Sequence, residues 1–248
     1  MNRINYSNSK YPVRTDYMDG HNRYWKRLAA PGNWLTSAQR VAVAKEVRQA
    51  RNCQLCAERK SALSPFSING KHDSNGELSE LIVDVVHRFI TDPARLTKTW
   101  FDGVLEQGLL VEEYVEILGT VVHVFAIDEF CRALDIPLNK LPEPQVGKPG
   151  HYRPSNVIEE SVDAWVPMLP RSIDTGPEAD LWEGMGANVI RGLSLVPDEV
   201  RSLVDLIGIH YAPLDKFMDL TGSPFGNLTR FQIELVGTRV SSYNDCFY

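Results

Sequence analysis

The chain of 248 residues lacks several features that would assign a protein to a class at once. Its 4 cysteines are too few for a small secreted scaffold built on disulfides. Its 26 basic residues are outnumbered by 32 acidic ones and form no long run, which argues against a nucleic-acid or anionic-membrane surface as partner. No apolar run reaches the roughly 18 residues of a membrane-spanning helix, and the first residues lack the apolar core of a signal peptide. We therefore expect a cytoplasmic protein with neither a nucleic-acid nor a membrane partner.

The sequence also lacks any useful stretch in which polar and apolar residues alternate with a period of two, the pattern of a half-buried strand. Apolar residues recur instead at helical spacing, so the predicted fold class is all-α. We expect a helix that begins at Thr36, helices over residues 78–90, 97–107 and 111–134, and two further helices split around Pro197.

Composition divides the chain into four stretches. Residues 1–34 show no clear periodicity and are expected to form an N-terminal arm on the surface of the fold or on a neighbour. Prolines and glycines concentrate in residues 138–177, which is typical of a linker between modules. We therefore expect a first module at 35–137 and the beginning of a second at 178–248.

One stretch of the first module recurs at the end of the chain. Residues 35–56 (LTSAQRVAVAKEVRQARNCQLC) recur in weakened form as residues 228–248 (LTRFQIELVGTRVSSYNDCFY), and the two stretches align without a gap up to the end of the chain, one position before a match to Cys56. Each copy begins with a capping box, a pattern in which two side chains satisfy backbone donors reciprocally: Thr36 with Gln39, and Thr229 with Gln232. The sequence thus predicts an internal tandem repeat whose second copy is incomplete.

Cys53 and Cys56 form a CxxC pair, which in a reducing compartment indicates redox chemistry or half of a metal site. We expect both cysteines in the first turn of a helix capped by Asn52, where the helix dipole stabilises a thiolate and lowers its pKa. Arg51 and Lys60 are expected to add positive charge, with Lys60 on the same helix face as both sulfurs. Two sulfurs placed in this way could attack an oxidant and then close a disulfide.

Other interpretations of the cysteines stay open. Buried cysteines commonly serve only as small apolar side chains. A zinc site would need further ligands, and since no second CxxC or Cys/His pair follows at a typical spacing, we expect neither a metal nor another cofactor. Cys131 is assigned to the core, and Cys246 is either reactive or structural.

The histidines offer one candidate for proton transfer. Glu116 and His123 lie on one face of the helix expected at 111–134, where a carboxylate and an imidazole could act in one relay. A core histidine with satisfied hydrogen bonds is an equally good interpretation of His123 and a better one of His87 and His210.

The repeated stretch and its cysteines resemble the motif of the alkylhydroperoxidase D-like, or carboxymuconolactone decarboxylase-like, superfamily of all-helical proteins. Its redox members carry a glutamate, then eleven residues, CxxC, three residues and a histidine. Glu234 stands at the matching distance before Cys246, in QIELVGTRVSSYNDCFY, and the segments ANVIRGLSLVP and VVHRFITDPARLT are similar to parts of peroxidase-related members. The resemblance covers most of residues 35–137 and 178–248.

Neither copy carries the complete motif of this superfamily. In the first copy Val41 and Lys60 occupy the glutamate and histidine positions, and the second copy stops at Tyr248, before its second cysteine.

The resemblance implies a cofactor-independent, antioxidant thiol peroxidase that assembles into a homo-oligomer. Cys53 and Cys56 would reduce a small hydroperoxide and be recycled by a thiol or dithiol reductant. Glu234 would act as general base and Cys246 as nucleophile.

Glu116 and His123 are expected to substitute for the missing relay residues. Two other functions stay open: a non-catalytic helical scaffold or oligomerisation module, and a decarboxylase-like acid–base enzyme that uses Glu116 and His123.

Overall fold

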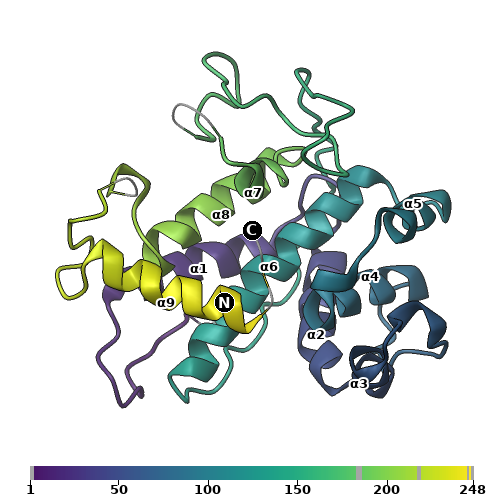
Figure 1. Ribbon diagram of the computed structural model, residues 1–248, viewed down its shortest axis with the longest axis horizontal. Coiled ribbons are helices and arrows are strands. Elements are labelled where there is room, and N and C mark those ends of the chain that lie inside the picture. The colour runs from purple at the N-terminus through teal and green to yellow at the C-terminus, as the bar shows by residue number, and fades with distance from the viewer. Residues whose placement is uncertain (1–2, 183–185, 217–218, 245, 247–248) are drawn as a thin grey trace.

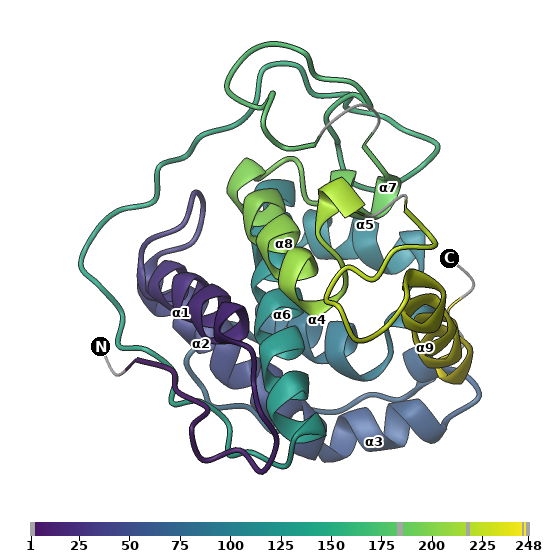
Figure 2. The same ribbon diagram turned by 90° about the vertical axis from the view of Figure 1, so that its left-hand side faces the viewer.

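The computed structural model describes residues 3–182, 186–216, 219–244 and 246, and these form an all-α fold, as predicted (Figures 1 and 2). Within the described residues there is no β-strand, and extended pairing is limited to two isolated bridges, Ile158 with Met168 and Ser161 with Ala164. The α-helices are α1 (Thr15–Ala29), α2 (Ser37–Gln49), α3 (Gln54–Ser61), α4 (Glu80–Thr91), α5 (Lys98–Glu106), α6 (Val111–Ala133), α7 (Asn188–Arg191), α8 (Pro197–His210) and α9 (Arg230–Tyr243). Every helix in this part of the chain is too short or too polar to cross a lipid bilayer.

The helix starts follow from local capping. The Thr36 side chain accepts a hydrogen bond from the backbone N–H of Gln39, and Gln39 Oε1 accepts from Thr36 N at 2.8 Å. Thr229 and Gln232 make the same box at α9, again with 2.8 Å between Thr229 N and the glutamine oxygen. Both predicted capping boxes are therefore confirmed, while the repeat itself stays a prediction.

The expected N-terminal arm is wrong for residues 15–29, which form α1 and enter the core. The buried side of α1 consists of Gly20, His21, Tyr24, Trp25, Leu28 and Ala29. Glycine, histidine and alanine make up half of this side, and a hydrophobic pattern does not count them as strong apolar positions. The other half, which includes Tyr24, Trp25 and Leu28, recurs at helical spacing and gives α1 an amphipathic pattern that the expectation of an arm overlooked.

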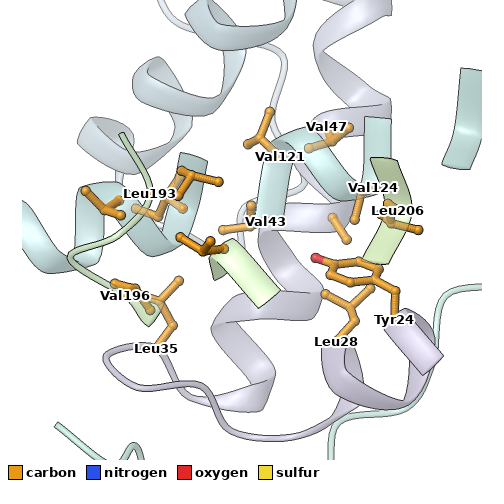
Figure 3. Packing of buried hydrophobic residues seen from close by; sticks show 14 of the residues in the cluster. Tyr24, Leu28, Leu35, Val43, Val47, Val121, Val124, Leu193, Val196 and Leu206 are labelled. Atoms are coloured by element: carbon orange, nitrogen blue, oxygen red, sulfur yellow. The ribbon is translucent and has the colours of Figure 1, made fainter. Parts of the chain in front are cut away.

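The main apolar core lies between α1, α2, α6 and α8 (Figure 3). Figure 3 shows Leu206 of α8 close to Tyr24 of α1 and Val124 of α6. Leu193 and Val196, which precede α8, belong to the same core and are buried. Helices from both sides of the expected linker therefore share one core.

The segment expected to be a linker, residues 138–177, contains no helix and runs along the side of the molecule and over its top (Figure 2). Backbone hydrogen bonds fix it to the turn between α1 and α2. Gln145 N donates to Ala29 O at 2.8 Å, and His151 N donates to Asn33 O at 2.7 Å. This segment is thus attached to the first helices along part of its length.

Two histidines, the buried His21 and the half-buried His210, join α1 to α8. Tyr6 Oη lies 2.6 Å from His21 Nδ1, and His21 Nε2 lies 2.7 Å from His210 Nε2. Burial, together with the neighbouring imidazole, lowers the pKa of His21 to about 3, and burial together with Arg14 lowers the pKa of His210 to about 4. Both rings are therefore neutral at pH 7.

We expect the free energy of unfolding to fall once the pH drops below about 6.5, the ordinary pKa of histidine. The unfolded chain then binds protons that the folded chain does not bind. The free energy of unfolding therefore falls by about 1.4 kcal/mol per pH unit for each histidine. This stability is complete above about pH 6.5 and is lost as the pH falls toward the lowered values. The variant His210→Gln should show a shallower slope in urea unfolding between about pH 7 and pH 4.5. Identical slopes for both proteins would contradict this account.

Candidate functional site

The CxxC pair lies at the start of α3, beside α4 (Figure 1). Cys53 is the N-cap of α3, one residue later than the predicted cap Asn52, and Cys56 follows in the first turn. Both cysteines are buried and pack with Leu55 and Ile68 in a small apolar cluster of their own. The two sulfurs are thus removed from water.

Two histidines complete a cluster around the sulfurs. His72, on the connection between α3 and α4, places Nδ1 3.4 Å from Cys53 Sγ and 3.5 Å from Cys56 Sγ. His87, on α4, places Nδ1 3.4 Å from Cys56 Sγ. One ligand atom from each of the four residues lies within 4.8 Å of the other three. The CxxC pair is therefore part of a four-residue Cys₂His₂ cluster.

Glu46 of α2 orients His87. Its Oε2 lies 3.0 Å from His87 Nε2, and the side chain is completely buried. Its Oε1 accepts from Ser74 Oγ at 2.9 Å and from Asn75 N at 2.7 Å, which anchors the connection that carries His72. Since an ionised carboxylate only accepts hydrogen bonds, we assign the ring proton of His87 to Nε2, and the lone pair of Nδ1 faces the sulfur.

Asp84 of α4 orients His72 in the same way. Its Oδ1 lies 3.0 Å from His72 Nε2 and accepts from Arg59 Nη1 at 2.7 Å, while its Oδ2 accepts from Arg88 Nε at 2.9 Å. Burial opposes ionisation of Asp84, but the hydrogen bond with His72 and the two guanidinium groups outweigh it and hold the pKa of this carboxyl below its usual range. The Nδ1 atom of His72 is thereby turned toward both sulfurs.

The expected lowering of the thiol pKa is wrong for Cys56. Burial, with a smaller contribution from Cys53, raises the pKa of Cys56 to about 12. Removal from water thus outweighs the dipole of a helix only two turns long. Burial also lowers the pKa of His87, against the hydrogen bond with Glu46, so this imidazole is neutral at pH 7.

The two basic residues expected to support the thiols are not members of the four-residue cluster. Lys60 is exposed, and Arg51 pairs with Glu129 of α6. Cys53 has extended backbone angles, φ −75° and ψ 121°, so a helical spacing does not place Lys60 on the face that carries its sulfur. The cation beside the cluster is Arg59.

Glu234 and Cys246 are not brought to the CxxC pair. The Glu234 carboxylate accepts from Tyr211 Oη at 2.6 Å and pairs with Arg230. Cys246 is exposed, and Asp245, the expected cap of a further helix, lies outside the described residues. Figure 1 shows α9 and α3 on different sides of α6. The roles of general base and nucleophile in a shared site therefore have no support in this geometry.

The helix that carries Glu234 keeps the apolar pattern of α2 without its burial. Val43 and Val47 of α2 are buried, whereas the matching Val236 and Val240 of α9 are 61% and 56% exposed. An exposed apolar face of this kind is typical of surfaces that contact another protein. Assembly into a homo-oligomer stays a prediction.

Glu116 and His123 lie in a different buried cluster, between α2, α6 and α8. Arg40 Nη1 lies 2.6 Å from Glu116 Oε1 and 3.0 Å from Glu199 Oε1, while Glu199 Oε2 lies 3.2 Å from His123 Nδ1. Gly32 permits this packing, because a Cβ atom there would lie 1.5 Å from Glu116 Oε1. The expected relay is thus an ion-pair network joined through Arg40 and Glu199, which favours a structural role.

The residues that surround and orient the cluster were not predicted from the sequence as partners of the cysteines. They are Glu46, His72, Asp84 and His87. The histidines follow Cys56 after 15 and 30 intervening residues, longer than the short Cys/His spacings that indicate a zinc site. One signal was available, because Glu46 follows Val43 by three residues and so lies beside the apolar face of a predicted helix.

Comparison of the chain with protein-family models, with curated proteins and with solved structures finds no match in any of the three. The resemblance to the alkylhydroperoxidase D-like superfamily stays a prediction. The function of the cluster is therefore argued from its own geometry.

Proposed function

We propose that this protein is a dithiol oxidoreductase that reduces small hydroperoxides through Cys53 and Cys56. The observation that carries the proposal is a buried series of side-chain contacts, from Glu46 to His87 and from His87 to Cys56. Its carboxylate and imidazole are 3.0 Å apart, and the imidazole and sulfur are 3.4 Å apart. A carboxylate that orients a histidine beside a thiol is a general means of activating a nucleophile. In this proposal α2 and α4 supply the base that the first copy of the sequence motif lacks.

The reaction begins with proton transfer from the Cys56 thiol to His87 Nδ1, and Glu46 stabilises the imidazolium. The thiolate attacks one peroxide oxygen, the O–O bond breaks, and the leaving alkoxide takes the proton from His87 to become an alcohol. Cys56 is now a sulfenic acid. The Cys53 thiol attacks its sulfur, water leaves, and a disulfide joins the two cysteines. The two electrons that reduce the peroxide come from the two sulfurs.

A thiol or dithiol reductant then returns both cysteines to the reduced state by thiol–disulfide exchange. The cytoplasm, where such reductants are abundant, is the compartment that suits this cycle. No cofactor takes part in it.

Access to the sulfurs requires movement of the covering chain, because Cys53 and Cys56 are only 2% and 3% exposed. The connection between α3 and α4 covers them. It is held by hydrogen bonds such as Gln54 N to Asp73 Oδ2 at 2.8 Å and Asn75 N to Glu46 Oε1 at 2.7 Å. In this proposal, opening of this connection admits the hydroperoxide.

The test treats reduced, metal-free protein with less than one equivalent of cumene hydroperoxide and identifies the oxidised cysteines by peptide mass spectrometry. We expect a disulfide between Cys53 and Cys56 while Cys131, in the core, stays a thiol. The variant Cys56→Ser should abolish the reaction, and the matched control Cys246→Ser should leave it unchanged. Oxidation of Cys246 with Cys53 and Cys56 still reduced would overturn the proposal.

The alternative function is a helical scaffold without catalysis, favoured by the exposed apolar face of α9. The double variant Cys53→Ser/Cys56→Ser separates the two functions. A scaffold keeps its oligomeric state and its cellular function in this variant, whereas a dithiol peroxidase loses its activity.

A further inference from the structure

We infer that Cys53, Cys56, His72 and His87 form a Zn²⁺ site with two sulfur and two nitrogen ligands. The inference goes beyond the proposed redox function and does not depend on it, because it rests on the geometry of four side chains and their supporting carboxylates.

The separations between ligand atoms fit a tetrahedral zinc ion. Zinc binds thiolate sulfur at about 2.3 Å and imidazole nitrogen at about 2.0–2.1 Å, so a tetrahedral angle places sulfur and nitrogen about 3.5 Å apart. The three observed separations are 3.4 Å from Cys53 Sγ to His72 Nδ1, 3.5 Å from Cys56 Sγ to His72 Nδ1, and 3.4 Å from Cys56 Sγ to His87 Nδ1. All four ligand atoms lie within 4.8 Å of one another.

Hydrogen bonds between the same groups explain these contacts less completely. His72 Nδ1 has one lone pair, yet it lies at nearly equal distances from the sulfurs of Cys53 and Cys56. A thiol proton can satisfy only one of these two contacts. A metal ion at the centre of the cluster satisfies both, together with the contact to His87.

The supporting carboxylates have the arrangement that metal-binding histidines usually have. A ligating imidazole commonly donates its other N–H to a carboxylate, which fixes the tautomer and strengthens the ligand. Glu46 lies 3.0 Å from His87 Nε2, and Asp84 lies 3.0 Å from His72 Nε2. Both imidazoles are therefore held with Nδ1 toward the sulfurs.

Charge and burial identify the kind of metal site. Two thiolates balance the charge of Zn²⁺, and sulfur with imidazole selects zinc over Mg²⁺ or Ca²⁺, which prefer oxygen. The side chain of His72 is 8% exposed and the other three ligands are more deeply buried. Four protein ligands in a buried site leave no position for a substrate, as in structural zinc centres. The site would fix α3 and its connection onto α4.

Zinc binding and dithiol oxidation exclude each other at these residues. The bound ion holds both sulfurs as thiolates, so no disulfide forms while it stays. Oxidation of Cys53 and Cys56 by a hydroperoxide removes two of the four ligands and releases the ion. In a protein that has both properties, zinc protects the reduced pair and its release accompanies oxidation.

The experiment uses the full chain, reduced and stripped of metal under anaerobic conditions, and titrates it with Zn²⁺ against a chromophoric chelator. We expect one tightly bound ion per chain, and X-ray absorption should show two sulfurs at about 2.3 Å and two nitrogens at about 2.0 Å. The variant His72→Ala should bind zinc at least about 100-fold more weakly, since even changes to supporting residues cost 10–100-fold. His151→Ala, an exposed histidine, is the matched control and should bind like the wild type.

A further variant protects the result from misfolding. His72→Cys replaces one zinc ligand by another and should restore tight binding, with circular dichroism confirming the helix content of each variant. Wild-type affinity in His72→Ala, or equal affinity in wild type and Cys53→Ser/Cys56→Ser, would overturn the inference.

The same variants separate this inference from the redox proposal. Metal-free His72→Ala keeps the side-chain contacts from Glu46 to His87 and from His87 to Cys56. Hydroperoxide should therefore still oxidise Cys53 and Cys56 to a disulfide in this variant. Zinc binding without disulfide formation would end the redox proposal and leave the zinc site. Disulfide formation without zinc binding would do the reverse.

Discussion

Replacing Glu46 by glutamine is expected to slow hydroperoxide-driven oxidation of the metal-free protein by about 1,000-fold, within the range that general base catalysis supplies. Glu46 Oε1 accepts from Ser74 and Asn75, and its Oε2 lies 3.0 Å from His87 Nε2. Glutamine has one oxygen, and turning it to the two loop donors leaves its N–H facing His87. The ring proton of His87 then moves to Nδ1, which becomes a donor toward Cys56 and no longer accepts a proton.

The rate of thiol loss after mixing with hydroperoxide measures this effect. Glu77→Gln is the matched control, because Glu77 is a half-exposed glutamate paired with Lys45 and should leave the rate unchanged. The Glu46→Gln variant should also bind Zn²⁺ about 10–100-fold more weakly, since it loses a carboxylate that supports a ligand. A wild-type oxidation rate in Glu46→Gln would show that the proton does not leave Cys56 through His87.

Replacing Arg40 by methionine is expected to lower the free energy of unfolding by about 3–5 kcal/mol, the usual effect of removing one partner from a buried ion pair. The Arg40 guanidinium lies between Glu116 and Glu199 at 2.6 Å and 3.0 Å, and all three side chains are at most 1% exposed. Methionine fills much of the volume but leaves Glu116 without its cation and Glu199 with only the more distant Arg27, at 3.7 Å. For a chain of this size the melting temperature should fall by about 10 °C.

Arg23→Met is the matched control for this change. Arg23 pairs with Asp205 at 2.6 Å between α1 and α8, but both side chains are more than a third exposed, so the expected loss is at most about 1 kcal/mol. Adding Glu116→Gln to Arg40→Met should restore part of the stability, because the charge left without a cation is then removed. Equal melting temperatures for the Arg40 and Arg23 variants would contradict a stabilising role for the buried network.

The positions of most helices could be predicted because their signals are local. The capping boxes at Thr36 and Thr229 are formed by residues three positions apart, and Gly108 ends the helix before it with a positive φ of 100°. The start of α1 offered no such signal, because Arg14 makes no side-chain cap and the buried side of α1 contains weakly apolar residues.

The candidate site was predictable only in part. The spacing of Cys53 and Cys56 alone identified the pair, and the superfamily resemblance suggested redox chemistry. It also directed attention to Glu234, whose carboxylate contacts Tyr211 and Arg230 instead. A motif read along the chain cannot show which helices pack together, so Glu46 was overlooked.

By itself the sequence determined the all-α class, the caps of α2 and α9 and the presence of a CxxC pair, since each depends on residues close together in the chain. Only the tertiary structure decided that Glu46, His72 and His87 surround the two sulfurs, because α2, α4 and the connection before α4 meet only after folding. It also decided the protonation of the site. The pKa of Cys56 is raised by burial, and burial is a property of the packed fold that residue spacing does not contain.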